Sequence, residues 1–550
     1  MMKKKLPVLI TMMMFFAVVM AQETNTYIVK LTDKANSPYK IENPEAYLSQ
    51  KALERREKQG IAIEETDLPV SPAYVEQIKA EGYSITHRIK WLNTLIVEGT
   101  ARENLEAFPF VKEVKKITPS KKPTEKPFFK NESESFRPES KNKGMQRDDD
   151  VYDYGEAFNQ IEMLNGHLVH NEGYDGQDMT IAVLDAGFQN ADEMEAFDSL
   201  WMNDRILGTA NFVNDEDIFN NSISSHGTSV LSTMGGNLPG QIVGTAPQAA
   251  YWLIRTEDAT DEYFMEEYYW VDGAEFADSV GADIINSSLG YTEGFNDPEN
   301  NHTYEDMDGN TTPVTIGADE AGSKGILVVN SAGNSGSDSW FYIGAPADGD
   351  SVMTVGAVDG SGNYVDFSSK GPTYDGRLKP DVAAKGSSAT VASVWGGVTY
   401  ASGTSFSSPI MAGMTASIWQ ANPSLSNMEL IELIREHGHQ ADEPDSLLGW
   451  GIPDFGAILD VIGTQNNNLT LQKAVDVYPN PFRKQITIDL PQPVDFTATL
   501  SNMAGKVILR QANQNSQETI LSGISHLPGG FYFLKIEMPE GEVIRKLIKK

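Results

Sequence analysis

Short apolar runs that alternate with helical patterns constrain the fold of this chain more than any other feature. Three of these runs are Thr180 to Leu184, Asp283 to Asn286 and Ile326 to Asn330, with β-branched residues on both faces. A strand that is apolar on both faces is typical of a parallel sheet covered by helices on both sides. Residues 151–464 are therefore predicted to form a doubly wound α/β domain.

The first residues have the pattern of a signal peptide. Three lysines, Lys3 to Lys5, precede an apolar run from Leu6 to Met20, and the small residue Ala21 follows. A membrane anchor is the alternative, but the run is shorter than the roughly 20 residues that a spanning helix needs. We interpret residues 1–21 as a signal peptide, which predicts export.

Residues 22–118 have the pattern of a small α+β unit. Strand patterns at Tyr27 to Leu31 and Val111 to Ile117 enclose helical patterns at Pro44 to Lys58 and Ala73 to Glu81. With the intervening runs, the order is strand, helix, strand, strand, helix, strand, which is that of a ferredoxin-like fold. Residues 119–150, rich in lysine, proline, glutamate and serine, are predicted to be an accessible linker.

A second polar break, Gln465 to Asn468, separates the central domain from the remainder of the chain. The remainder, 465–550, carries alternating patterns at Gln485 to Leu490, Thr497 to Ser501 and Phe531 to Ile536. Alternation with period two indicates half-buried strands, so we predict a small β-sandwich.

Composition excludes several functions. The chain has 77 acidic against 43 basic residues, a formal net charge of -34, and no cysteine. Such a charge argues against nucleic-acid binding, which needs a basic surface. Without cysteine there are no disulfides, thiolate metal sites or cysteine nucleophiles, so covalent catalysis must use oxygen or nitrogen.

Three segments carry side chains suited to nucleophilic catalysis. Asp185 follows the first apolar strand, His226 begins a helical stretch of small residues, and Ser405 lies at or just before the start of an apolar helix. A carboxylate at the end of a parallel strand projects into the ligand crevice, and a helix amino terminus favours developing negative charge. Taken singly, each residue also fits a turn, a structural histidine or a helix cap.

A fourth segment makes the combination specific. Asn334 follows the strand Ile326 to Asn330 within Ser-Ala-Gly-Asn-Ser-Gly, where an asparagine amide could donate to an oxyanion. The order Asp, His, Asn, Ser resembles that of the subtilisin-like serine proteases. Asp-Ala-Gly at Asp185, His-Gly-Thr-Ser-Val at His226 and Gly-Thr-Ser-Phe-Ser-Ser-Pro around Ser405 resemble the three catalytic motifs of that family.

The resemblance implies a secreted serine endopeptidase that acts by acyl transfer. It implies a triad of Asp185, His226 and Ser405, with Asn334 in the oxyanion hole and no required cofactor. The segment Asn-Ser-Ser-Leu-Gly resembles the substrate-binding strand of the family, which gives that role to a further set of residues: Ser288, Leu289 and Gly290. One departure is Ala186, where the family usually has serine or threonine.

The flanking regions also resemble parts of secreted subtilases. Residues 22–118 resemble the inhibitory propeptide, which makes the linker 119–150 the processing region; an unrelated accessory domain is the alternative. The tail resembles the sorting domain of type IX secretion, with Tyr-Pro-Asn-Pro-Phe from Tyr478 and basic residues ending in Lys549-Lys550. This implies export through the periplasm of a Gram-negative bacterium, with a substrate-binding sandwich as the alternative. The expected partners are polypeptide substrates, the propeptide and the type IX machinery.

Two acidic runs, Asp215 to Asp217 and Asp306 to Asp308, could ligate structural calcium through hard oxygen atoms. Solvated loops are the simpler interpretation, so no metal ligand is assigned.

Two rival functions remain open. An α/β-hydrolase would need G-x-S-x-G, and Ser407 stands where the last glycine should be. A catalytically inactive surface binding or adhesion protein on the same fold is the other rival.

Overall fold

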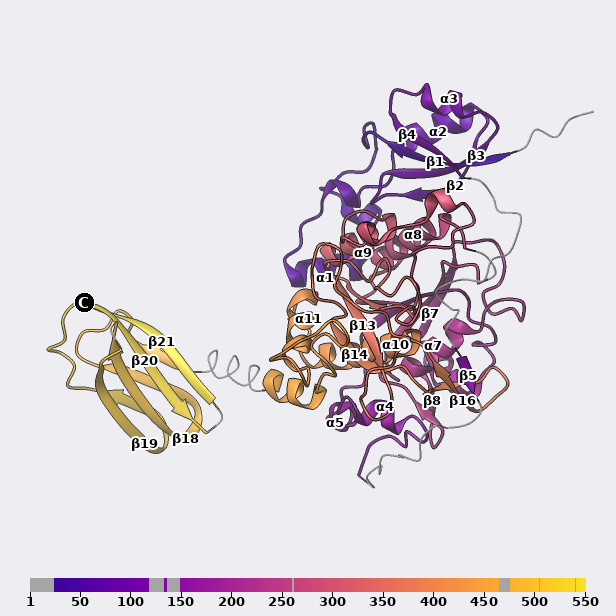
Figure 1. Cartoon of the computed structure of the whole chain (residues 1–550). Helices are drawn as coiled ribbons and strands as arrows, with labels where there is room; N and C mark the ends of the chain where they lie inside the picture. Colours follow the sequence, from indigo (N-terminus) through magenta and orange to yellow (C-terminus); the bar gives the residue numbers. More distant parts are fainter. Residues whose placement is uncertain are drawn as a thin grey trace, which may run out of the picture.

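The computed structural model describes residues 24–117, 149–259, 262–463, 475–503, 505–539 and 541–550. It describes residues 133–135 by their backbone alone. The predicted signal peptide and most of the predicted linker lie outside these residues. An N-terminal α/β unit, a large central α/β unit and a C-terminal all-β unit follow one another along the chain (Figure 1). Among the described helices, none is long and apolar enough to cross a membrane.

The central unit is built on seven parallel strands in the order β14-β13-β12-β11-β6-β10-β7. They are β6 (Thr180–Asp185), β7 (Ile206–Asn211), β10 (Ala250–Arg255), β11 (Ile284–Ser287), β12 (Leu327–Ser331), β13 (Val352–Val358) and β14 (Val382–Lys385). The predicted doubly wound parallel sheet is confirmed. The three apolar runs of the sequence correspond to β6, β11 and β12.

Helices cover both faces of this sheet. Ile181 and Val183 of β6 enter one core, and Ala182 and Leu184 enter another on the opposite face. The first core is completed by α7 (His226–Gly235), α10 (Thr404–Ala421) and α11 (Asn427–Glu436), the second by α8 (Met265–Val280) and α9 (Pro313–Ser323). Because successive side chains of a strand point to opposite faces, a strand between two helical layers must be apolar throughout.

Smaller elements complete the central unit. They are α4 (Phe158–Glu162), α5 (Gly166–Asn171), α6 (Asp198–Met202) and the paired strands β8 (Asn237–Leu238) and β9 (Ile242–Val243). A separate antiparallel sheet has the order β15-β16-β5 and consists of β15 (Ala389–Ala392), β16 (Val398–Ser402) and β5 (Ser133–Ser135). Strand β5 comes from the predicted linker.

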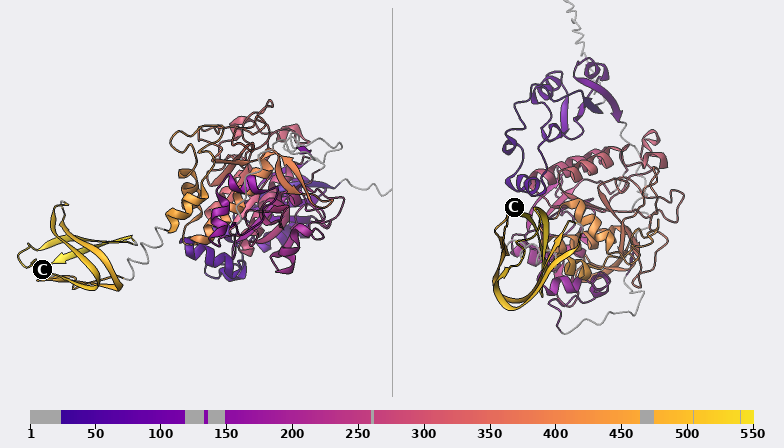
Figure 2. Two further views of the ribbon diagram at one scale, coloured as in Figure 1. Left: turned by 90° about the horizontal axis from the view of Figure 1, so that it is seen from below. Right: turned by 90° about the vertical axis from the view of Figure 1, so that its left-hand side faces the viewer.

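The N-terminal unit has a four-stranded antiparallel sheet in the order β2-β3-β1-β4. Its elements are β1 (Asn25–Leu31), α1 (Gln50–Gln59), α2 (Pro72–Ala80), β2 (Ser84–Ile89), β3 (Thr94–Gly99), α3 (Arg102–Glu106) and β4 (Val111–Ile117). This order is the predicted ferredoxin-like one. Figure 2 shows the unit resting against the long helix α8 of the central unit.

One helix of this unit differs from the sequence pattern. Residues Pro44–Ala46 form a separate 3₁₀ turn, and α1 begins only at Gln50. The reason is a helix cap: the side chain of Ser49 accepts a hydrogen bond from the Ala52 N–H at 3.2 Å.

The C-terminal unit is all-β, as predicted. It consists of β17 (Asp476–Tyr478), β18 (Ile486–Asn502), β19 (Val507–Leu521), β20 (Gly530–Met538) and β21 (Gly541–Lys549). The first half of β18 pairs with β17 and the second half with β20, so one bent sheet encloses a single apolar core.

The two strands predicted at 485–490 and 497–501 are the two halves of β18. Pairing of β18 with β19 is irregular between Asp489 and Phe496, around Pro491 and Pro493. Proline has no N–H to donate to the neighbouring strand. The alternating sequence pattern is therefore interrupted at these prolines, although the strand itself continues.

Candidate active site

Strands β6, β11 and β12 of the central sheet end at the same level. The motif segments that follow them therefore begin at one edge of the sheet. Register pairs Ser287 of β11 with Leu184 of β6 on one side and with Asn330 of β12 on the other. The segments that begin at Asp185, Ser288 and Ser331 therefore leave the sheet side by side at its carboxyl edge. In parallel α/β sheets this edge is where ligands bind.

Asp185 and His226 are in direct contact. His226 Nδ1 lies 2.8 Å from Asp185 Oδ1, and the Ala186 N–H donates to the same oxygen at 2.7 Å. Asp185 is fully buried. The backbone N–H of Ala186 thus stabilises the carboxylate although its side chain has no hydroxyl.

The glycine after His226 is required by packing. A Cβ on Gly227 would lie 2.4 Å from the carbonyl oxygen of Gly187 and 3.0 Å from the Cβ of Asp185. Any larger residue would push the start of α7, and with it the imidazole, away from the Asp185 turn.

Ser405 is the second residue of α10 and is fully buried. Its Oγ donates to the Ser288 carbonyl at 3.5 Å, and the Ser288 Oγ donates to the Ser405 carbonyl at 2.9 Å. The next residue, Phe406, lies with its ring centroid 6.0 Å from that of His226, and α10 packs against α7. The structure therefore brings Ser405 beside both Ser288 and the end of α7 that carries His226.

Asn334 is anchored to the residue before Ser405. Its Oδ1 accepts hydrogen bonds from the Thr404 N–H at 2.8 Å and from the Thr404 Oγ1 at 2.9 Å, and the side chain is buried. Because the Oδ1 end of the Asn334 amide accepts both hydrogen bonds from Thr404, its Nδ2 donor points away from Thr404. The sequence did not predict Thr404 as the residue that orients Asn334.

The segment from Ser288 to Gly290 continues β11 along the site. Ser288 and Leu289 are buried, Gly290 is half-buried, and the Leu289 carbonyl accepts from Asn330 Nδ2 at 3.0 Å. The following Tyr291 forms a backbone bridge with Ala345, with its N–H donating at 2.8 Å. These contacts fix the path of the segment beside Ser405.

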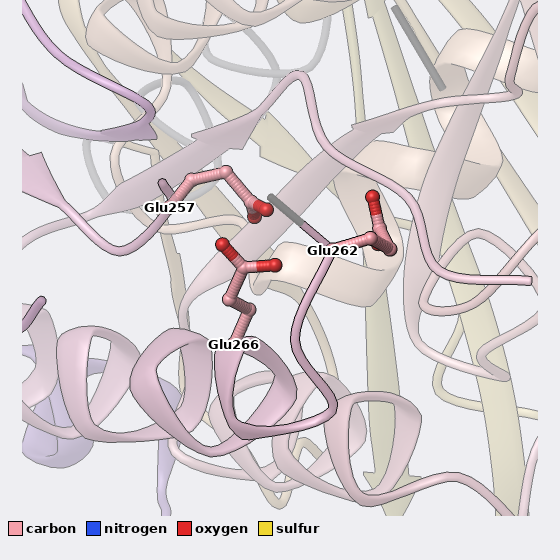
Figure 3. Close-up of side chains that lie close together, drawn as sticks. All are labelled: Glu257, Glu262 and Glu266. Carbon is pink, nitrogen blue, oxygen red and sulfur yellow. The ribbon is translucent and has the colours of Figure 1, made fainter. Parts of the chain in front are cut away.

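Three buried glutamates that the sequence analysis missed, Glu257, Glu262 and Glu266, lie close together (Figure 3). Glu266, in the first turn of α8, accepts from the N–H groups of Asp258 at 2.7 Å and Tyr263 at 2.9 Å. Glu257 accepts from the Tyr291 hydroxyl at 2.7 Å. Burial and then the charge of Glu257 raise the pKa of Tyr291, which keeps the phenol protonated as a donor.

Glu262 completes this group, and one ligand oxygen of each glutamate lies within 4.8 Å of the others. Among the residues that the structure describes, this is the one group of three acidic side chains whose oxygen atoms lie close enough together to share a cation. The two acidic runs that the sequence analysis considered for calcium instead accept hydrogen bonds from nearby backbone N–H groups. Asp217 accepts from the Phe219 N–H, as a turn-forming carboxylate does. Asp306 accepts from the Thr303 N–H as part of the capping box of the short 3₁₀ helix Tyr304–Asp306. Calcium at those runs stays a prediction.

The N-terminal unit and the central unit share an apolar core. Five side chains of the N-terminal unit pack with α8 and α9 in one cluster: Ile28, Ile89, Trp91, Ile96 and Ile117. The sheet of the N-terminal unit therefore buries one face against the helical layer of the central unit.

Buried charges cross the same interface. Asp278 of α8 pairs with Arg55 at 2.5 Å, with Arg56 at 2.9 Å and with Lys90 at 3.3 Å. Burial alone would raise the pKa of Asp278, but the three cations outweigh it and hold that pKa below its ordinary value. One turn earlier, Glu275 accepts from the N–H groups of Lys90 at 2.9 Å and Trp91 at 2.8 Å.

Comparison with known families divides the chain in the same way. The subtilase family profile matches residues 176–451, the profile of the peptidase S8 propeptide domain of Bacteroidota matches 26–132, and that of a secretion system C-terminal sorting domain matches 476–550.

Several curated proteins are similar over the central unit. Subtilisin E of Bacillus subtilis (strain 168) is 32% identical over 275 residues, 49% of this chain and 63% of the relative. Subtilisin of Bacillus pumilus is 32% identical over 275 residues, 49% of this chain and 87% of the relative. The chain thus spans less than two thirds of the length of subtilisin E. The crystal structure of MycP1 from Mycobacterium smegmatis aligns with a TM-score of 0.43 at 20% identity, covering 55% of this chain and 84% of that one.

The matches account for all three units in the order in which the chain presents them, and the Bacillus pumilus relative is covered over most of its length. The chain therefore belongs to the subtilase family of S8 peptidases, carries the propeptide domain of that family and a type IX secretion sorting domain, and is a secreted or cell-surface protein of a Gram-negative bacterium.

Proposed function

We propose that this chain is a secreted serine endopeptidase that uses Asp185, His226 and Ser405 as its triad. The observation that carries the proposal is the 2.8 Å contact between His226 and the buried Asp185, together with the position of Ser405 in the first turn of α10. A histidine held by a buried carboxylate beside a serine at a helix amino terminus is suited to activating that hydroxyl.

The proposed reaction is acyl transfer from a peptide bond to Ser405. His226 takes the proton from Ser405 Oγ as this oxygen adds to the peptide carbonyl carbon. Asp185 holds the imidazole tautomer and stabilises the imidazolium. The proton then passes to the leaving amide nitrogen as the C–N bond breaks, and water hydrolyses the ester by the same steps in reverse order.

Asn334 supplies the oxyanion donor in this proposal. Its Oδ1 is engaged by both polar groups of Thr404, so the amide is already oriented before substrate arrives. A fixed donor needs no reorganisation as charge develops, and one such donor contributes about 3–4 kcal/mol to stabilising the transition state.

Ser288, Leu289 and Gly290 are proposed to pair with the acyl side of an extended substrate. The segment continues β11 past the sheet edge, and Ser288 contacts Ser405 directly. Backbone pairing with a strand binds extended peptides with modest dependence on their sequence.

The N-terminal unit is proposed to be an intramolecular inhibitor of this enzyme. The shared apolar core and the buried charges at Asp278 and Glu275 support a tightly docked precursor. The C-terminal unit is proposed to be read by the type IX machinery, in keeping with the sorting-domain match.

Replacement of Ser405 tests the catalytic proposal. Casein or fluorogenic-peptide hydrolysis by the mature protein should fall roughly 10⁴- to 10⁶-fold in Ser405→Ala. Ser407→Ala is the matched control, because Ser407 is a buried serine of the same helix whose hydroxyl donates to the Thr404 carbonyl at 3.0 Å. It should keep activity within a few fold. Equal activity of Ser405→Ala and the parent would refute the triad, and a folded but inactive parent would favour the binding or adhesion protein.

A further inference from the structure

A buried arginine joins the loops that follow three neighbouring strands of the central sheet. Arg255 is the last residue of β10, which lies between β6 and β7. Its Nε donates to the carbonyls of Ala186 and Glu257, both at 3.2 Å, and its Nη1 donates to Asn214 Oδ1 at 3.0 Å. These acceptors lie in the segments after β6, β10 and β7, respectively. Arg255 therefore holds three loops at the edge of the sheet that carries the proposed active site.

The sheet register places Arg255 beside the proposed triad. Arg255 of β10 pairs with Asp185 of β6, and two residues earlier Leu253 pairs with Val183. That earlier pair belongs to the core that α7 covers, so Arg255 and Asp185 point to the same face of the sheet. The helix α7, which begins at His226, packs on this face. The fold thus brings the guanidinium, the carboxylate and the imidazole to one side of the sheet.

The turn after Asp185 is held at two successive carbonyl groups. The Thr256 N–H donates to the Asp185 carbonyl at 3.1 Å. Arg255 Nε donates to the next carbonyl along the chain, that of Ala186. Between these two carbonyls lies the Ala186 N–H, which donates to Asp185 Oδ1 at 2.7 Å. Because both flanking carbonyls are tied to β10 and the residue after it, this N–H keeps its direction towards the carboxylate.

Close packing couples this turn to the start of α7. A Cβ on Gly227 would collide with the Gly187 carbonyl oxygen, and a Cβ on Gly187 would collide with Ile223. With so little space, a shift of the turn must also move the first residue of the helix, His226. The 2.8 Å contact between Asp185 and His226 then changes.

The guanidinium is itself fixed inside the protein. The Arg255 side chain is 5% exposed and forms an ion pair with Glu216 at 3.7 Å. Burial lowers the pKa of Arg255, and the charges of four carboxylates oppose that shift: Asp258, Glu216, Glu266 and Glu257. Two of the three clustered glutamates therefore act as counter-charges for this arginine. A planar guanidinium donates in several fixed directions at once, which the single ammonium of a lysine cannot reproduce.

We propose that Arg255 is a positioning residue of the triad, which aligns Asp185 with His226 through the Ala186 turn. This inference rests on the proposed peptidase function. In that reaction His226 becomes an imidazolium, and Asp185 stabilises this cation best when the contact between them is well aligned. Because Ala186 has no hydroxyl, the alignment depends on the backbone contacts of the turn, and Arg255 fixes one of them. Arg255 acts through the turn and not on the substrate.

The test compares Arg255→Lys with the parent as mature enzyme on a fluorogenic peptide. Active sites are counted with a fluorophosphonate that labels reactive serines. Lysine keeps the charge and much of the volume but loses the Nε donor. A misplacement of about 1 Å in a catalytic group can cost about 10²-fold, so kcat should fall about 10- to 100-fold with KM within about threefold.

A pH profile separates positioning from a loss of charge or of stability. The acidic limb of kcat/KM reports the pKa of the histidine base in the free enzyme. A poorer contact with Asp185 stabilises the imidazolium less and lowers this pKa, so the limb should move to lower pH in Arg255→Lys. A merely structural role would lower the urea midpoint but leave the limb and kcat per active site unchanged.

Two further variants complete the experiment. Arg435→Lys is the matched control, because Arg435 Nε donates to the buried Asp381 at 2.9 Å, just before β14 and so at the opposite edge of the sheet. It should lose stability but keep kcat and the limb. Asn214→Ala removes the acceptor of Arg255 Nη1 and should move the limb in the same direction as Arg255→Lys, by a smaller amount.

The other outcomes overturn defined conclusions. An unchanged kcat and limb in Arg255→Lys, or a limb moved to higher pH, would overturn the positioning role. An equal loss of kcat in Arg435→Lys would overturn it as well, because the effect would then be common to buried arginines. If Arg255→Lys does not fold, an unchanged limb in Asn214→Ala overturns the role. A parent without activity on casein would instead overturn the proposed peptidase function.

Discussion

Replacing Arg55 with alanine should weaken the binding of the N-terminal unit to the mature enzyme. Arg55 of α1 enters the interface with its side chain 3% exposed and pairs with the fully buried Asp278 at 2.5 Å. Its other donors reach two backbone carbonyls of the central unit, Ala282 at 2.5 Å and Lys324 at 3.1 Å. The alanine variant loses one ion pair and leaves two carbonyl groups without this donor.

The expected loss of binding free energy follows from the burial of this ion pair. Truncating one partner of a buried, hydrogen-bonded charge pair costs about 2–5 kcal/mol. Asp278 keeps Arg56 at 2.9 Å and Lys90 at 3.3 Å, so its charge stays compensated and the lower part of that range applies. At about 1.4 kcal/mol per factor of ten, a loss of about 2–3 kcal/mol corresponds to a 30- to 150-fold weaker inhibition constant.

The assay adds the separate segment 22–118 to mature enzyme and measures inhibition of peptide hydrolysis, with circular dichroism to verify that each variant is folded. Lys51→Ala is the matched control. Lys51 pairs with Asp283 across the same interface at 3.1 Å, but its side chain is 40% exposed. An exposed pair contributes about 0.2–1 kcal/mol, which is at most about fivefold. Equal losses in the two variants would refute the argument from burial.

Three further outcomes are expected. Asn334→Ala should lower kcat about 10²- to 10³-fold with little change in KM, and an equal loss through KM would contradict the oxyanion role. Burial lowers the pKa of His170 to about 4, so its contribution to stability is complete above pH 6.5 and is lost as the pH falls towards 4. The loss amounts to about 3 kcal/mol, and urea unfolding of inactive Ser405→Ala protein with and without His170→Gln should show a flatter pH dependence in the double variant. Deleting residues 476–550 should spare peptidase activity but stop surface delivery, as cell fractionation would show; normal delivery would contradict the sorting role.

Local patterns in the sequence were sufficient for much of the fold. Strands β6, β11 and β12 were predicted within one residue at each end because a run that is apolar on both faces has few alternatives in a parallel sheet. The boundaries of the N-terminal helix and of β18 were wrong. The N-terminal helix begins late because of a single cap at Ser49, and β18 passes through two prolines because both of its halves are paired to neighbours.

The sequence by itself determined which residue types occur in which motif, and so the candidate roles of Asp185, His226, Asn334 and Ser405. Only the tertiary structure decided their geometry: the contact of His226 with Asp185, the anchoring of Asn334 by Thr404 and the register of β5 on β16. The physical reason is the range of the interactions. Strand and helix patterns depend on neighbours a few residues apart, whereas these contacts join segments 41, 70 and more residues apart in the chain, which meet only when the sheet and its helices pack.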